Sequence, residues 1–166
     1  MFFDNLERSE LEKIERVGVL KSFKAGECII NEGDSGRSFS IILAGEVEVS
    51  KKMPGGHHKV LVDLKEFDVV GELGFFGVKS RSATVTAKTD CEILEFDNIK
   101  FEDFVAVRPV VGMKIYKNMA KVLAERLASN DATLMNTIVW ALGQPNNLAI
   151  DHDINIRLTP EESSSG

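Results

Sequence analysis

Apolar residues recur at helical spacing at the start of the chain and again after residue 96, and alternate with polar residues in between. Near the start, Leu11, Ile14 and Val17 share one helical face, which predicts a short helix over residues 5–17. Ser9 is followed three residues later by Glu12, the spacing of a capping box that would close the first turn of this helix.

Between residues 20 and 96 the pattern is that of short strands separated by turns. Apolar and polar residues alternate around 39–43, 47–49 and 60–64, and further strand-like segments follow at 84–87 and 92–96. Turn signals stand between these segments, at Gly45, Glu32-Gly33-Asp34 and Met53-Pro54-Gly55-Gly56. Many short strands at this spacing are typical of an antiparallel barrel or jelly roll.

A helical period returns after Phe96. Asp97 is a suitable N-cap for a helix over about 98–107, and Pro109 suits the first turn of the helix that follows. We expect that second helix to run over 110–142 and to stop at Gly143-Gln144-Pro145. It carries one apolar stripe, formed by Ile115, Met119, Leu123, Leu127, Leu134 and Ile138.

A helix of this length needs a surface to cover its stripe. A second copy of the helix, meeting the first in a coiled-coil-like seam, is the economical partner and predicts a homodimer. Asn130 lies near the middle of the stripe, where a buried Asn would fix the register. The alternative is that the helix packs only on its own barrel.

Composition narrows the class of protein. A chain of 166 residues, 43% hydrophobic and 28% charged, suits one globular domain, and the polar, Ser-rich segment 143–166 is expected to be a flexible tail. No signal peptide or membrane span is evident, so we expect a cytoplasmic protein, with Cys28 and Cys91 as two reduced core thiols. The net charge of −6 argues against a general nucleic-acid surface, so a bound phosphate would need a local site.

The segment over 71–84 carries the chemistry needed for such a local site. Its glycines frame a short helical turn at Leu73 to Phe76, and the first N–H groups of a helical turn suit an anion. Arg81 offers a bidentate guanidinium, and Ser82 and the Ala83 N–H offer further donors. Glu72 is only an acceptor when ionised and suits a sugar hydroxyl. This combination fits a nucleotide held by its ribose and phosphate.

The same segment resembles the phosphate-binding cassette of the cyclic-nucleotide-binding domain family. The resemblance is carried by Gly71-Glu72-Leu73-Gly74 and Arg81-Ser82-Ala83-Thr84-Val85, and also by Phe23 to Glu27, Glu32 to Asp34 and Leu43 to Val47; it covers roughly residues 3–140. The chain departs from the family pattern at Ser80, at Glu66-Phe67-Asp68 and at Val70, where the family usually has Pro, Pro-Gly-Asp and an aromatic residue.

The resemblance implies an α+β fold, an eight-stranded antiparallel β jelly roll over about 20–96 flanked by an N-terminal helix and C-terminal helices, within a domain over 1–142. It implies that Glu72 holds the ribose 2′-hydroxyl and that Arg81 and Ser82 hold the cyclic phosphate, alongside backbone groups at Gly71 and Leu73. The ligand would be cyclic AMP or cyclic GMP, with no other cofactor. The long helix would cover the base, with Arg126 and Asn130 as candidate lid residues.

Other functions are less well supported by the sequence. Its three histidines, His57, His58 and His152, do not form a metal-binding pattern, and no nucleophile arrangement is evident, so we expect neither an enzyme nor a metal site. The residues after Leu142 carry mostly acidic charge, which disfavours DNA binding. Two hypotheses remain: a stand-alone regulatory sensor that acts on an unidentified effector protein, and a structural module of the same fold that binds no nucleotide.

Overall fold

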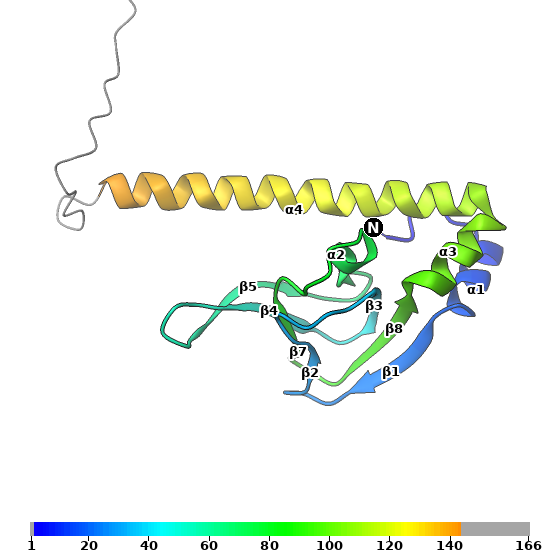
Figure 1. Ribbon diagram of the computed structural model, residues 1–166, viewed down its shortest axis with the longest axis horizontal. Coiled ribbons are helices and arrows are strands. Elements are labelled where there is room, and N and C mark those ends of the chain that lie inside the picture. The colour runs from blue at the N-terminus through cyan, green and yellow to red at the C-terminus, as the bar shows by residue number, and fades with distance from the viewer. Residues whose placement is uncertain (1, 144–166) are drawn as a thin grey trace, which may run out of the picture. The chain divides into compact units, whose positions relative to one another are not determined.

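The computed structural model describes residues 2–143 (Figure 1). The chain divides into two compact units, Met1–Glu125 and Arg126–Gly166, and each unit is treated by itself. The element order of the first unit is one short helix, eight strands interrupted by a single helical turn, and a further helix. The long helix α4, Pro109–Gly143, begins in the first unit and supplies the described part of the second.

Eight antiparallel strands form two four-stranded sheets, as the jelly-roll prediction requires. One sheet has the order β1-β8-β3-β6 and the other β2-β7-β4-β5. The strands are β1 (Val19–Phe23), β2 (Cys28–Ile30), β3 (Ser38–Ala44), β4 (Val47–Lys52), β5 (His58–Leu64), β6 (Val69–Val70), β7 (Thr84–Ala87) and β8 (Cys91–Asp97). The α+β jelly-roll prediction is therefore confirmed.

Strand β3 is buried on both faces, because it separates two hydrophobic cores. Phe39 and Ile41 face a helix-side core, whereas Ile42 faces a sandwich core between the sheets. The helix-side core consists of Phe2, Ile14, Phe39, Ile41, Val69, Phe75, Leu94, Phe96, Phe101, Phe104, Val111, Ile115 and Met119. The sandwich core consists of Ile42, Val47, Leu64, Val70, Val85, Ala87, Cys91 and Ile93.

The N-terminal helix α1 spans Arg8–Glu15, shorter than the predicted helix, and its cap lies two residues earlier than expected. Glu7 is the N-cap, and its backbone N–H donates to the Glu10 carboxylate at 2.8 Å. The predicted capping box of Ser9 and Glu12 is therefore wrong. Two overlapping pairs had suitable spacing, and the carboxylate of Glu10 is the one held by Lys114 of α4, at 2.8 and 2.9 Å.

The second predicted cap is confirmed. Asp97 precedes helix α3, Asn98–Ala106, and its carboxylate accepts from the N–H groups of Ile99 and Lys100 at 3.1 and 3.2 Å. Pro109 is the first residue of α4, as expected. Within residues 2–143, no helix has an apolar stretch long enough to cross a membrane.

The apolar stripe predicted on the long helix is divided between two environments. Ile115 and Met119 are fully buried in the helix-side core of their own chain, so assigning them to a seam between two copies was wrong. Leu127 and Leu134 are exposed, at 63% and 59%. The side chain of Ile138 and the predicted tail after Gly143 lie outside the described residues.

The two cysteines also differ. Cys91 is buried in the sandwich core and donates through Sγ to the carbonyls of Glu46 and Thr89, both at 3.2 Å. Cys28 is exposed on β2, so the prediction of two core thiols is wrong for this residue. Partial burial still raises the pKa of the Cys28 thiol above its ordinary value.

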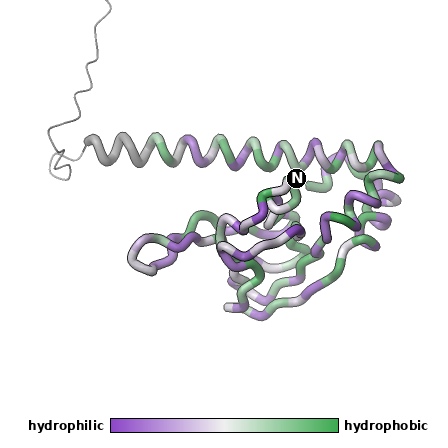
Figure 2. The backbone as a smooth tube through the Cα atoms, viewed as in Figure 1, coloured by the Kyte–Doolittle hydropathy of each residue, from purple (hydrophilic) through white to green (hydrophobic). Residues whose placement is uncertain are grey.

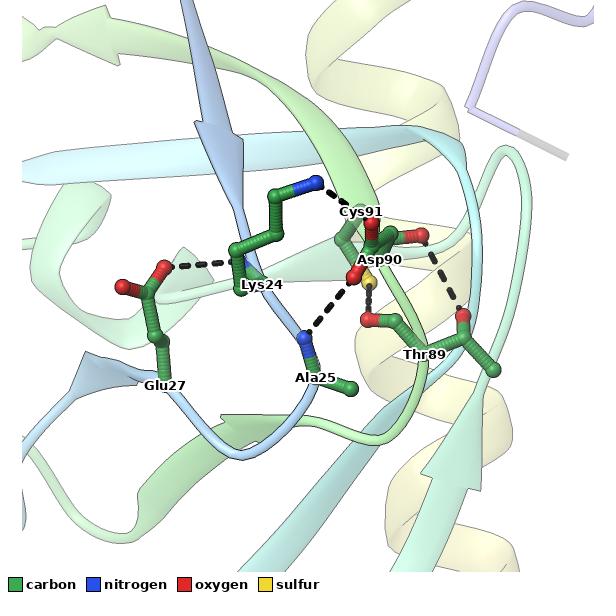
Figure 3. A network of polar contacts seen from close by, with 6 residues as sticks. All are labelled: Lys24, Ala25, Glu27, Thr89, Asp90 and Cys91. Carbon is green, nitrogen blue, oxygen red and sulfur yellow. Dashed lines mark hydrogen bonds and ion pairs between the residues drawn. The ribbon is translucent and has the colours of Figure 1, made fainter.

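Figure 3 shows the β1–β2 turn and the β7–β8 turn meeting around Asp90 and Cys91. Asp90 accepts from the Lys24 ammonium at 2.7 Å and from the Ala25 N–H at 3.1 Å, which ties the β1–β2 turn to the β7–β8 turn. Thr89 Oγ1 accepts from the Glu46 N–H at 3.0 Å, so the β3–β4 turn joins the same cluster. These contacts close the end of the sandwich at which the β1–β2, β3–β4 and β7–β8 turns meet.

Candidate functional site

The candidate site is built on a single helical turn, α2, Glu72–Phe75. Gly71 is its N-cap and has a φ of 77°, a left-handed conformation that favours glycine. The turn is fixed to the fold at its other end, where the Phe75 ring packs edge-on against Phe39 with centroids 4.9 Å apart. Phe39 in turn stacks on Phe96 of β8. The sequence placed this turn at Leu73 to Phe76, one residue later than observed.

The side chain of Arg81 lies over the start of this turn. Its Nη1 donates to the Ser38 carbonyl at 2.7 Å and to the Gly71 carbonyl at 3.2 Å, and its Nη2 donates to Ser38 Oγ at 2.9 Å. The backbone of Arg81 is also fixed, because its N–H donates to the Asp34 carbonyl at 2.8 Å and its carbonyl accepts from the Gly33 N–H at 2.9 Å. The guanidinium is thus positioned by β3, by the turn and by the β2–β3 loop.

Three glycines make room for this guanidinium. A Cβ atom on Gly36 would lie 2.4 Å from Nε of Arg81, and one on Gly71 or Gly74 would lie 2.6 or 2.8 Å from Nη1. Real Cβ atoms do not approach other atoms so closely, so a larger residue at any of these positions would displace the guanidinium or distort the turn. These three glycines therefore leave the space in which the Arg81 side chain lies, in addition to shaping the backbone.

The charges around Arg81 are mostly acidic. Partial burial lowers the pKa of the Arg81 guanidinium below its ordinary value, and the carboxylates of Glu95, Glu72 and Asp34 oppose that shift. An arginine remains protonated at neutral pH in spite of such a shift. Glu72 is only 7% exposed. The site thus holds a cation and a buried carboxylate within electrostatic range of each other, which can separate an anionic group of a ligand from a hydroxyl group.

The other predicted ligand-binding residues are spread over two units. Leu73 and Ala83 are partly buried and Ser82 is exposed, in the same loop region as Arg81. The candidate lid residues Arg126 and Asn130 belong to the second unit, as a partly buried and an exposed residue of α4. Their relation to the site stays a prediction.

Three residues at the site were not identified from the sequence. Ser38 and Gly36 hold and accommodate the guanidinium, yet both lie more than forty positions before Arg81. Asn98 is 8% exposed and its Nδ2 donates to the Gly74 carbonyl at 2.9 Å, while its own N–H donates to the Arg37 carbonyl at 2.9 Å. Asn98 is the first residue of α3, so its side chain connects the end of the turn α2 to the start of that helix.

Two apolar residues of the second sheet lie beside the strand that follows this loop, because Val49 of β4 pairs with Val85 of β7. Val49 of β4 packs against the sandwich core and is paired directly with Val62 of β5, which places the two side chains on the same face. Val62 is nevertheless 46% exposed.

Ser80 stands where the resembled family usually has Pro. It contacts the β2–β3 loop in two ways: its backbone forms a β-bridge with Ser35, and its Oγ donates to the Gly33 carbonyl.

Comparison with known proteins identifies the family and the fold. The family model of the cyclic nucleotide-binding domain matches residues 20–108. The cAMP-activated global transcriptional regulator CRP of Salmonella typhimurium is 30% identical over 152 residues, which cover 86% of this chain and 72% of the relative. The cAMP-dependent protein kinase regulatory subunit of Mycosarcoma maydis is 36% identical over 85 residues, 51% of this chain and 16% of that protein.

Solved structures show the same fold. The catabolite activator protein of Thermus thermophilus has a TM-score of 0.72 at 24% identity and matches 82% of this chain, which covers 62% of that chain. The cAMP-bound PfPKA-R fragment is 38% identical with a TM-score of 0.55, over 63% of this chain and 39% of its own. The relatives are regulatory proteins by name. On the match of the family model over residues 20–108, this chain belongs to the cyclic nucleotide-binding domain family.

Proposed function

We propose that this chain is a regulatory sensor rather than an enzyme, and that it binds a cyclic nucleotide at the turn α2. The proposal rests on the placement of Arg81, which brings a guanidinium over the turn and close to the buried carboxylate of Glu72. Arg81 and Ser82 would hold the cyclic phosphate, together with N–H groups of Leu73 and Ala83 and the backbone of Gly71. Glu72 would accept from the ribose 2′-hydroxyl, and the apolar side chains of Val49 and Val62 would face the base.

Cyclic AMP is the preferred ligand in this proposal, with cyclic GMP as the weaker one. The support comes from relatives whose names specify cAMP, among them the Salmonella regulator and the fungal kinase subunit. The Ser82 hydroxyl does not discriminate between the two, since it serves the phosphate that both share.

A calorimetric titration with both nucleotides tests the phosphate half of the site. Arg81→Lys keeps the charge but loses the fork, so we expect the dissociation constant for cyclic AMP to rise about 10- to 100-fold, the equivalent of one charge-assisted hydrogen bond. Arg37→Lys makes the same substitution at an exposed arginine of the β2–β3 loop and should leave affinity unchanged. Equal losses in both variants would contradict the assignment of Arg81.

The sugar half of the site has its own test. Glu72→Gln should weaken binding of cyclic AMP while leaving binding of 2′-deoxy cyclic AMP unchanged, because the analogue lacks the hydroxyl that Glu72 would accept from. Equal weakening of both ligands would remove the ribose role from Glu72. Absence of binding of either natural nucleotide at millimolar concentration would support the alternative function, a structural module that binds no nucleotide.

We further propose that the chain forms a homodimer through α4, with a seam different from the predicted stripe. Met113, Tyr116, Ala120, Leu123, Leu127, Asn130 and Leu134 follow one another at alternating spacings of three and four, the pattern of a coiled-coil face. Met113 is 70% exposed in the first unit and Leu127 63% in the second, so these two residues are available for a partner, whereas the Tyr116 ring also stacks on Phe75 of the helix-side core. Sedimentation of Leu127→Glu beside the unchanged protein tests it, and an unaltered mass would contradict the seam.

The signal would pass from the ligand to α4 and from there to a second copy or to an effector protein. Arg126 and Asn130 remain the proposed residues that close over the base. Because Arg126 does not lie on the proposed seam, Arg126→Ala should weaken binding of the nucleotide without altering the mass of the dimer. The cytoplasmic location and the lack of direct DNA binding also stay predictions.

A further inference from the structure

The β4–β5 hairpin concentrates positive charge in a chain whose net charge is −6. Residues 51–59 contain Lys51, Lys52, Lys59, His57 and His58 and no acidic residue. The hairpin is exposed throughout this segment and extends beyond the other strands (Figure 1). Figure 2 shows hydrophilic colours along its arms, next to a hydrophobic stretch of β5. An anionic partner is thus favoured at this hairpin by charge complementarity.

The pairing register makes this concentration of charge unfavourable in the isolated chain. Lys51 lies directly opposite Lys59, so two ammonium groups face each other across the hairpin. Like charges directly opposite each other in an antiparallel pair destabilise it. Glu32 is the acidic residue that contacts this segment within residues 2–143, and it accepts from the backbone N–H of Lys52 at 2.8 Å and not from a lysine ammonium.

Strand β5 adds two features that specify the shape of the partner. It is the last strand of its sheet, so within residues 2–143 no strand pairs with its outer edge. Next to the basic end, Val60, Leu61 and Val62 are 50%, 52% and 46% exposed. A long edge strand with an exposed apolar run is a template for an added strand, and proteins usually protect such an edge with charges or a bulge along its length. Here Lys59 and Asp63 flank the apolar run, and the pairing register shifts at Leu61, yet Val60 and Leu61 remain exposed.

We infer that the outer edge of β5 is a docking site for an extended acidic peptide segment of another protein. The segment adds a strand to the sheet, its carboxylates contact Lys59 and the lysines of β4, and its apolar residues cover Val60 and Leu61. A nucleic acid meets the charge but offers neither strand pairing nor apolar side chains. An anionic membrane meets the charge and the apolar run but leaves the backbone edge unpaired.

The test uses the full chain and the synthetic peptide Glu-Glu-Glu-Thr-Val-Thr-Val-Thr, acetylated and amidated, in a fluorescence titration. We expect saturable binding below about 1 mM, the weak end of specific recognition. Lys51→Glu combined with Lys59→Glu should weaken it at least about tenfold, since several ion pairs become repulsions. Lys13→Glu combined with Lys100→Glu makes the same charge change at exposed lysines outside the hairpin and should leave binding unchanged.

Two further arms separate strand addition from other binding. The same peptide with alternate backbone N-methyl groups cannot form the ladder and should not bind, and hydrogen exchange of β5 should slow only with the unmethylated peptide. Failure of the acidic peptide to bind would overturn the inference, and so would equal binding of the methylated form. Phosphatidylserine vesicles bound in place of the peptide would assign the hairpin to a membrane. None of these outcomes depends on nucleotide binding.

Discussion

Gly36→Ala should weaken nucleotide binding although Gly36 offers no side chain to the ligand. The added Cβ would lie 2.4 Å from Nε, 2.5 Å from Nη2 and 2.6 Å from Cζ of Arg81. Ordinary contact begins at 3.4 Å, so the guanidinium would have to move by about 1 Å. The movement would also strain its hydrogen bonds to Ser38, at 2.7 and 2.9 Å.

The expected loss of binding free energy follows from the contact between the Arg81 guanidinium and the phosphate, which Gly36→Ala would misplace. A buried, hydrogen-bonded charge pair costs about 2–5 kcal/mol when one partner is removed. A displaced guanidinium keeps its charge near the phosphate but loses the fork, so we expect roughly half of that loss, about 1–2.5 kcal/mol, or about 5- to 70-fold in the dissociation constant. Calorimetric titration with cyclic AMP measures it directly.

A double-mutant cycle isolates the cause. Lysine has no guanidinium for the new Cβ to displace, so Gly36→Ala should have little effect in an Arg81→Lys background. Ser35→Ala, a substitution at the neighbouring exposed position, controls for changes in the loop. The reasoning fails if Gly36→Ala binds as tightly as the unchanged protein, or if its loss persists at full size in the Arg81→Lys background.

Three further predictions concern stability and reactivity. Asn98→Ala should lower the free energy of unfolding by about 1–3 kcal/mol in a urea titration, because the carbonyls at the end of α2 lose their donor. Lys24 lowers the pKa of the Asp90 carboxyl in the folded state. The stability that Asp90 contributes is therefore present at neutral pH and is lost as the pH falls through that lowered pKa. Asp90→Asn should unfold at a lower temperature than the unchanged protein at pH 7, and the two unfolding temperatures should converge in acid. Iodoacetamide should label Cys28 in the folded protein, more slowly than a free thiol because its pKa is raised, and Cys91 only after unfolding.

Local signals in the sequence were sufficient where the structure depends on neighbouring residues. Asp97 caps α3 because its carboxylate reaches N–H groups only two and three positions away. Gly71 lies next to the turn that it opens, with the positive φ that its residue type favours. The strands at 84–87 and 92–96 appear as β7 and β8, since their alternation reports burial against one core.

The failures concern long-range contacts. A helical period places Ile115 and Leu127 in one apolar stripe. It does not predict that Ile115 is covered by the chain's own aromatic residues while Leu127 is left exposed. The position of Ser38 opposite Arg81 depends on the arrangement of the sheets, which residue spacing does not contain. Phe67 is a further case: it has a φ of 68° where the family usually has glycine, and the chain keeps the turn through the bond of its N–H to the Ile42 carbonyl at 2.8 Å.

The contacts of Arg81 have a consequence for how its function can be measured. Its guanidinium already donates to Ser38 on β3 and to Gly71 at the start of the turn, so it holds the site together in the absence of a ligand. Deleting the side chain would leave a partly buried carbonyl and hydroxyl without their donor, and would reduce stability together with affinity. A loss of binding in Arg81→Ala therefore has two causes that calorimetry alone does not separate. Gly36→Ala leaves the guanidinium on the chain and strains its bonds to Ser38 without deleting them, so a loss of affinity in that variant, compared in the Arg81→Lys background, reports on the geometry that the phosphate requires.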